Sequence, residues 1–138
     1  MEFEVTDKIE KADEEVIYNG LLEYNLKRLE DKEPKELGIY IRNDKNEIIA
    51  GLIGSTHGNW LLVKYLWLEE ELRGSGIGSK ILKKAEETAR DRGAKYVFLD
   101  TFSFQAPMFY EKQGYKKVFV LDNYPITGKR YYYTKELL

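Results

Sequence analysis

The sequence contains no cysteine, a single histidine, His57, and only three prolines. The absence of cysteine excludes a disulfide framework, a thiolate nucleophile and a cysteine-based zinc site, and we expect no bound metal. The first eleven residues are polar and lack the apolar core of a signal peptide or a membrane span. We therefore expect a cytoplasmic protein with no membrane partner.

A strong charge of either sign is also missing. The net charge is −2 and no run of basic residues occurs, which argues against nucleic acid as a partner. The chain has 138 residues, 43% of them hydrophobic, and no internal repeat. These values predict a single globular domain over residues 1–138 with a core of its own.

The most informative segment that is present is the glycine-rich stretch Arg73-Gly74-Ser75-Gly76-Ile77-Gly78-Ser79. It follows the apolar run Leu66-Trp67-Leu68 and opens a helical segment. A strand that ends in a glycine-rich turn and leads into a helix directs backbone N–H groups and the positive end of the helix dipole to one place. Such a place suits a pyrophosphate, although a helix that simply begins after a flexible turn would look similar.

The spacing of the glycines excludes two other phosphate-binding loops. Gly74, Gly76 and Gly78 occupy positions one, three and five, whereas the dinucleotide fingerprint needs positions one, three and six. The P-loop needs a lysine directly after its last glycine, but here Ser79 precedes Lys80.

A second motif lies downstream, in residues 106–115. It reads Ala106, three residues, Tyr110, three residues, and then Gly114 followed by the aromatic Tyr115. One amphipathic helix and one strand separate the two motifs. In sequence, spacing and order, both motifs resemble the GNAT superfamily of N-acetyltransferases, in which the first is the acyl-CoA pyrophosphate loop and the second is a short helix that closes the cofactor site.

Hydrophobic spacing and turn residues predict the remaining elements. They are a strand at residues 3–6, a helix at 12–30 capped by Asp13, strands at 38–42, 48–56 and 60–68, a helix at 77–92 that ends at Gly93, a strand at 96–100, and a hairpin of strands at 115–121 and 129–134. With the resemblance, this order predicts an α/β (α+β) GNAT fold. Its mixed, largely antiparallel sheet has six to seven strands with one parallel pair at the cofactor site, and about four helices flank it.

The resemblance implies acetyl-CoA as the cofactor and assigns its contacts. These are the strand residues Leu66, Trp67 and Leu68, the loop residues Arg73, Gly74, Ser75, Gly76, Ile77, Gly78 and Ser79, and Ser103 and Phe109 beyond the loop. Ser103 stands where relatives often carry asparagine, which makes its contact weaker. Tyr110 is implied as the hydrogen-bond donor to the leaving thiolate, because a phenol, with a pKa of about 10, is a weaker acid than a thiol, at about 8.5. The alternative is that Tyr110 only packs.

The acceptor side is less defined. Tyr24, Asn25, His57, Trp60 and Tyr124 are candidates for an acceptor pocket, and His57 is also the single candidate for an imidazole base. Relatives often have an acidic pair where this chain has Lys64 and Tyr65, which argues against a polycationic acceptor. A homodimer is left open.

These observations predict an acetyl-CoA-dependent N-acetyltransferase that acts on a primary amine of a small molecule or a peptide. An acyl-CoA-binding module without turnover is an alternative. A nucleotide-binding regulatory domain is a third, against which the glycine spacing argues.

Overall fold

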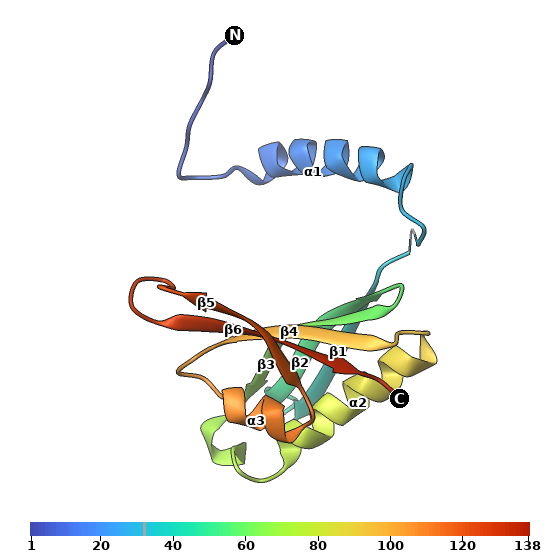
Figure 1. Ribbon diagram of the computed structural model, residues 1–138, viewed down its shortest axis with the longest axis vertical. Coiled ribbons are helices and arrows are strands. Elements are labelled where there is room, and N and C mark those ends of the chain that lie inside the picture. Colours follow the sequence, from blue (N-terminus) through green and yellow to red (C-terminus); the bar gives the residue numbers. More distant parts are fainter. Residues whose placement is uncertain (32) are drawn as a thin grey trace. The chain divides into compact units, whose positions relative to one another are not determined.

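The computed structural model describes residues 1–31 and 33–138, and the chain falls into two compact units, Met1–Lys32 and Glu33–Leu138 (Figure 1). The first unit contains one helix, α1, at Lys11–Leu26. The strand predicted at residues 3–6 is wrong: these residues form no strand, and residues 1–31 of this unit contain no second strand with which they could pair.

Two details of α1 also differ from the prediction. The helix ends at Leu26 rather than at residue 30, and a turn follows in which the N–H groups of Arg28 and Leu29 both donate to the Asn25 carbonyl. Asp13 is not the cap: Glu10 occupies the N-cap position, and Asp13 lies in the first turn, where a carboxylate favours the helix dipole.

The second unit is built on one six-stranded sheet, which agrees with the predicted six to seven strands. Its strands are β1 (Lys35–Arg42), β2 (Ile48–His57), β3 (Trp60–Leu68), β4 (Tyr96–Phe102), β5 (Lys116–Asp122) and β6 (Lys129–Glu136), in the order β1-β2-β3-β4-β6-β5. All neighbours are antiparallel except β3 and β4, the predicted parallel pair. The unit's helices are α2 (Ile77–Asp91), α3 (Pro107–Lys112) and a 3₁₀ turn, η1 (Glu70–Leu72). The described residues thus form three α-helices rather than about four.

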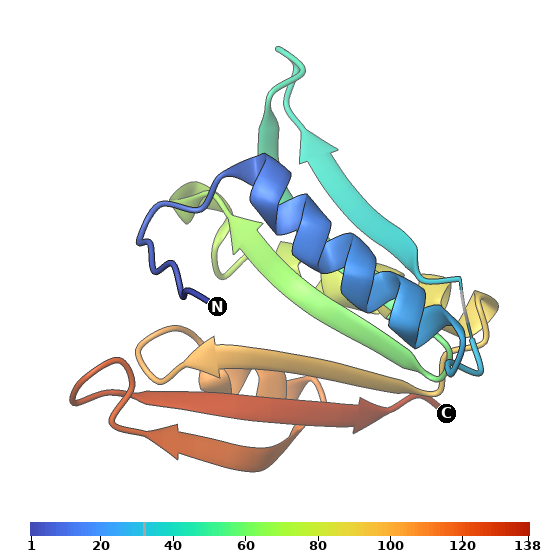
Figure 2. The same ribbon diagram turned by 90° about the horizontal axis from the view of Figure 1, so that it is seen from above.

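The parallel pair holds together over a short length. Only Trp60, Leu61 and Leu62 pair with β4, after which the two strands diverge towards their carboxyl ends (Figure 2). The sheet therefore opens between β3 and β4.

A bulge in β3 lies at the start of this opening. Ile53 pairs with Tyr65 and Gly54 pairs with Val63, so that Lys64 is an extra residue on β3. The bulge reverses the alternation of side chains, because it turns Leu66 and Leu68 to the side that Leu61 and Val63 occupy before it. Only glycine fits at position 54, since a Cβ there would lie 2.3 Å from the Leu62 carbonyl oxygen.

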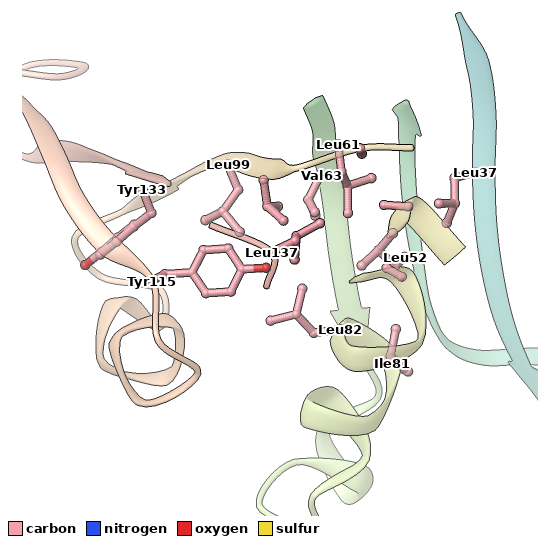
Figure 3. Packing of buried hydrophobic residues seen from close by; sticks show 14 of the residues in the cluster. Leu37, Leu52, Leu61, Val63, Ile81, Leu82, Leu99, Tyr115, Tyr133 and Leu137 are labelled. Carbon is pink, nitrogen blue, oxygen red and sulfur yellow. The ribbon is translucent and has the colours of Figure 1, made fainter. Parts of the chain in front are cut away.

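Helix α2 covers the buried face of the opened sheet. The predicted apolar stripe of this helix is confirmed, and it packs on side chains from four strands (Figure 3). The stripe comprises Ile81, Leu82, Ala85 and Ala89, and the strand residues include Leu37, Leu52, Leu61, Val63, Val97 and Leu99. This packing fixes the N-terminal end of α2 close to the end of β3.

Candidate active site

A cavity of about 790 Å³ lies where the sheet opens. Four segments line it: the end of β3, the glycine-rich turn with the start of α2, the loop after β4, and α3. The lining residues are Leu66, Trp67, Leu68, Arg73, Gly74, Gly76, Gly78, Ser79, Phe104, Gln105, Ala106, Phe109, Tyr110 and Gln113. The structure therefore brings both sequence motifs to one cavity.

The glycine-rich turn depends on backbone conformation. Gly74 and Gly76 have φ angles of +77° and +87°, which other residues rarely adopt, although a Cβ at either position would meet nothing within 4 Å. Gly76 is the N-cap residue of α2. Gly78 differs, because it is buried within the helix and a Cβ there would lie 3.5 Å from the Phe109 ring and 3.6 Å from Leu68.

The first turn of α2 carries N–H groups that the described part of the protein does not use. The first N–H bond of the helix runs from Lys80 to the Gly76 carbonyl, and Ile77, Gly78 and Ser79 donate to no acceptor among the described residues. Within residues 1–31 and 33–138 no side chain caps this end, and no acidic residue lies in its first turn. The helix dipole and these donors make the position suited to an anion.

Two polar side chains border this turn. Arg73 donates from Nε to the Leu68 carbonyl at 3.3 Å, which holds its guanidinium beside the end of β3. The Ser79 hydroxyl lies 2.9 Å from Oε1 of Gln113 and so joins the start of α2 to the end of α3.

Tyr110 lies on α3 with its ring packed against three aromatic neighbours. The ring centroids of Phe109, Tyr115 and Tyr133 lie 5.2, 5.9 and 6.1 Å away. The Tyr110 hydroxyl has no hydrogen-bond partner among the described residues. Every fully buried polar side-chain atom in the described part of the chain does have a partner, so this hydroxyl is not fully buried and is accessible from the cavity that Tyr110 lines.

Burial, and secondarily the charge of Asp100, raise the pKa of Tyr110 to about 12. The phenol is thus a weaker acid than its ordinary pKa of about 10 suggests. At neutral pH it is a hydrogen-bond donor and not a base.

Six of the predicted site residues in the second unit do not line this cavity. Ser75 and Ile77 belong to the turn, but the Ser75 hydroxyl bonds the Leu72 carbonyl and Ile77 packs against the core. Ser103 donates its N–H to the carbonyl of Lys129 at 2.9 Å, beside the turn of the β5–β6 hairpin. Trp60 and His57 pair at the turn between β2 and β3, and Trp60 lies eight residues, about 25 Å along a strand, from Leu68.

The three remaining acceptor candidates lie in the β5–β6 hairpin and in α1. Tyr124, also outside the cavity lining, lies in the β5–β6 hairpin, where its hydroxyl accepts a hydrogen bond from Arg130 at 3.2 Å and its ring packs 5.6 Å from Phe102. Tyr24 and Asn25 lie in the last turn of α1, in the other unit, where the Arg28 guanidinium lies 3.8 Å from the centre of the Tyr24 ring.

Sequence reasoning missed four lining residues as site residues. Ala106 could have been found, because it is the first residue of the second motif. Gln113 directly precedes Gly114 of that motif, but only the fold brings it to Ser79. Phe104 and Gln105 carry no pattern: Gln105 folds the loop by accepting hydrogen bonds from the Phe102 N–H and the Thr101 hydroxyl at 2.7 and 2.9 Å. Such contacts form only in the folded chain.

The described residues contain no group of three or more histidine, cysteine, aspartate or glutamate side chains arranged to hold a metal ion. No helix within residues 1–31 and 33–138 is both long and apolar enough to cross a membrane. The cytoplasmic location stays a prediction.

The site combines an opened mixed sheet with a donor-rich helix N-terminus and a tyrosine, an arrangement that can hold an anionic ligand beside a hydroxyl donor. Residues 4–115 match the model of the acetyltransferase (GNAT) family. The chain belongs to this family and is an acetyltransferase, as the sequence motifs predicted.

Individual relatives support this assignment. An acetyltransferase of Agrobacterium fabrum is 39% identical over 86% of this chain and 86% of its own length. The blasticidin-S acetyltransferase of Streptomyces morookaense is 33% identical over 81% of this chain and 85% of its own. The crystal structure of a protein from Agrobacterium tumefaciens that is classed as an acetyltransferase has a TM-score of 0.93 at 35% identity, over 99% of both chains.

Proposed function

We propose that this protein transfers the acetyl group of acetyl-CoA to a primary amine of a small molecule. One observation carries the proposal: the first turn of α2, whose N–H groups find no acceptor among the described residues, and the hydroxyl of Tyr110 border the same cavity. An acyl-CoA has an anionic pyrophosphate at one end of its arm and a thioester at the other. The two features suit these two ends.

The pyrophosphate fits the first turn of α2. The N–H groups of Ile77, Gly78 and Ser79 would donate to its oxygens, and the positive φ angles of Gly74 and Gly76 shape the turn around it. The guanidinium of Arg73 adds a positive charge at the rim of the same cavity.

The arm fits the open edge of β3. From residue 63 to residue 68, β3 pairs with β2 but not with β4 in the described sheet. The backbone groups on that edge are available to an extended ligand, which would bind much as an added strand does. This supports the sequence prediction that backbone groups of Leu66, Trp67 and Leu68 hold the cofactor.

Bound acetyl-CoA would supply an acetyl group activated as a thioester. Tyr110 would donate a hydrogen bond from its Oη to the departing sulfur, which stabilises the charge that develops there. With a pKa of about 12 the phenol remains protonated in the physiological range, so it does not serve as the base that deprotonates the amine.

The acceptor class is supported by one relative. The blasticidin-S acetyltransferase, by its name, acetylates a small molecule, which favours a small-molecule acceptor over a peptide. The family match also runs through both compact units, over residues 4–115. This supports the further proposal that residues 1–138 act as one acetyltransferase domain.

The test combines binding and turnover on the full chain. Calorimetry should detect binding of acetyl-CoA and CoA but not of ATP, and free thiol should be released when acetyl-CoA is mixed with members of a panel of small primary amines. Binding without thiol release for any amine or peptide would instead indicate an acyl-CoA-binding module. Binding of ATP alone would indicate a nucleotide-binding domain and overturn the proposal.

A further inference from the structure

A buried polar cluster lies outside the cavity lining and meets two lining residues, Gln113 and Tyr110. The Tyr115 ring of the cluster packs edge-on against the Tyr110 ring, with 5.9 Å between the ring centroids. The cluster joins α2, the end of α3, and β6. The carboxylate of Glu86 accepts hydrogen bonds from the Tyr115 hydroxyl at 2.7 Å and from the Lys135 ammonium at 3.0 and 3.2 Å. Glu86 is only 3% exposed, so these bonds compensate a charge that would otherwise be costly to bury.

The cluster contacts α3 at the C-terminal end of that helix, through the carbonyl group of Gln113. The Lys135 ammonium donates to the Gln113 carbonyl at 2.8 Å, where a positive charge also favours the C-terminal end of the helix dipole. Tyr115 follows one residue after Gly114, whose φ of +91° turns the chain out of the helix. In Figure 3 the Tyr115 ring reaches from the α3 side of the core towards α2.

Gln113 is also tied to α2 at a second point. Its side-chain oxygen accepts a hydrogen bond from Ser79 at 2.9 Å, whereas its backbone carbonyl is held by the Lys135–Glu86 pair. Ser79 and Glu86 are seven residues apart, which places them on one face of α2, about 10.5 Å from each other along the helix. Helix α3 is therefore fastened to α2 at two separated points.

Tyr110 lies three residues before Gln113, less than one turn away on the same short helix. Fastening the end of α3 thus fixes the Tyr110 hydroxyl relative to the first turn of α2. This relation matters if the two features act on opposite ends of one ligand, because misplacing a catalytic group by about 1 Å can cost about a hundredfold in rate.

We infer that Glu86, Lys135 and Tyr115 are positioning residues, which hold α3 against α2 so that Tyr110 meets the reacting sulfur. The inference rests on the proposed function, because it takes Tyr110 as the group that acts in turnover. None of the three residues lines the cavity, so they would act through the placement of α3.

The test replaces both charges of the cluster at once. The Glu86→Gln/Lys135→Met variant removes the donor to the Gln113 carbonyl without leaving a single buried charge unpaired. The matched control is Lys84→Met/Glu87→Gln, the same change in an ion pair of α2 that is 69% and 60% exposed. If the first variant does not fold, Tyr115→Phe removes one hydrogen bond of the cluster and is measured in its place. Lys135→Arg, made with Glu86 unchanged, retains the positive charge that Lys135→Met removes and serves as the rescue variant.

The first readout is hydrogen exchange, which needs no activity. The N–H groups of Phe109, Gln113, Gly114 and Tyr115 bond within the α3 segment. We expect them to exchange at least tenfold faster in the cluster variant, with the β2 amides and the control unchanged. Unchanged exchange in α3 would overturn the inference whether or not the protein transfers acetyl groups.

The second readout is kcat at saturating acetyl-CoA, measured in parent and Tyr110→Phe backgrounds. We expect the cluster variant to lower kcat about tenfold in the parent, less than twofold in Tyr110→Phe, and Lys135→Arg to recover most of the loss. An equal tenfold loss in both backgrounds would show that the cluster does not act through Tyr110. Absence of thiol release in the parent would overturn the proposed function instead, and the exchange result would still decide whether the cluster holds α3.

Discussion

The two ends of helix α2 are completed in opposite ways. At the C-terminal end, Arg92, Gly93 and Ala94 all donate N–H bonds back to the last turn, and Gly93 has the φ of +95° that this reversal requires. The Arg92 guanidinium also donates to the carbonyls of Lys35 and Glu36 and to the Thr56 hydroxyl. Among the residues that the structure describes, the N-terminal end has no side-chain cap, no acidic residue in its first turn and three N–H groups without an acceptor.

This difference in the number of satisfied backbone groups favours the N-terminal end of α2 as the place where a ligand would bind. Unused donors at a helix end reduce stability unless another group accepts from them. The protein satisfies the end of α2 that faces β1 and β2, and leaves open the end that faces the cavity. An anion at the open end would supply the missing acceptors.

The largest expected effect comes from breaking this contrast with Gly76→Asp. A carboxylate at the open end would repel a pyrophosphate, and two charges about 4 Å apart near a protein surface repel by about 4 kcal/mol, which is roughly a thousandfold in affinity. We expect acetyl-CoA binding, measured by calorimetry, to be lost.

The control for this prediction is Gly93→Asp, at the closed end. Gly93 has a similar positive φ and equally no atom within 4 Å of a Cβ, so the backbone strain is matched. We expect this variant to bind acetyl-CoA within about threefold of the parent. Equal affinity in the two folded variants would contradict the loop assignment.

The next effect concerns turnover rather than binding. Tyr110→Phe keeps the ring packed among Phe109, Tyr115 and Tyr133 but removes the hydroxyl. Loss of one hydrogen bond to developing charge is worth about 2.7 to 4 kcal/mol, or a hundred- to a thousandfold in kcat. We expect that decrease with the Kd for acetyl-CoA nearly unchanged. Turnover within about twofold of the parent would show that Tyr110 only packs.

The pH profile sharpens the same prediction. Because deprotonation removes the donor, activity that depends on this phenol is lost as pH rises through its pKa, which burial and Asp100 raise to about 12. We therefore expect no basic limb from Tyr110 below about pH 11, whereas an unperturbed phenol would give one near pH 10. A limb near pH 10 that disappears in Tyr110→Phe would contradict the role of burial.

The sequence predicted the parts of this site that depend on local pattern. The residues of β3 and the start of α2 at Ile77 were expected from apolar spacing and glycine placement, and both have the predicted bounds. The absence of a side chain permits the positive φ angles of Gly74 and Gly76, but the sequence does not distinguish these two glycines from Gly78, which has no positive φ. The resemblance of residues 106–115 to the family's second motif predicted that Tyr110 lies at the cofactor site, and Tyr110 lines the same cavity as the glycine-rich turn.

The remaining features depend on contacts between distant segments. The bond between Ser79 and Gln113 spans 34 residues, and Asp100 influences Tyr110 across two elements. The strand predicted at residues 3–6 failed for a related reason, since a strand forms only where the fold provides a partner. Single-sequence periodicity contains none of this information.

A smaller effect is expected from Arg73→Ala. This change removes one charged contact at the open end but leaves the N–H groups in place. A hydrogen bond to a charged group is worth about 1.5 to 3 kcal/mol, and because Arg73 is exposed to salt we expect the lower end, about a tenfold weaker Kd for acetyl-CoA. Calorimetry at low and high salt should show a weaker salt dependence for the variant than for the parent. An unchanged salt dependence would remove Arg73 from the phosphate site.

The smallest effect is expected from His57→Ala. His57 ends β2 and pairs with Trp60 at the turn into β3, at the far end of that strand from the cavity. A base must come within hydrogen-bond reach of the proton that it removes, and the cavity lining among the described residues does not include His57. We therefore expect kcat/KM within about twofold of the parent, with the acid limb of the pH profile unshifted. His57→Gln, which retains a polar side chain at the turn, should behave alike. A loss of about a hundredfold confined to kcat, together with a flattened acid limb of the pH profile, would instead identify His57 as the base and show that the acceptor reaches the β2–β3 turn.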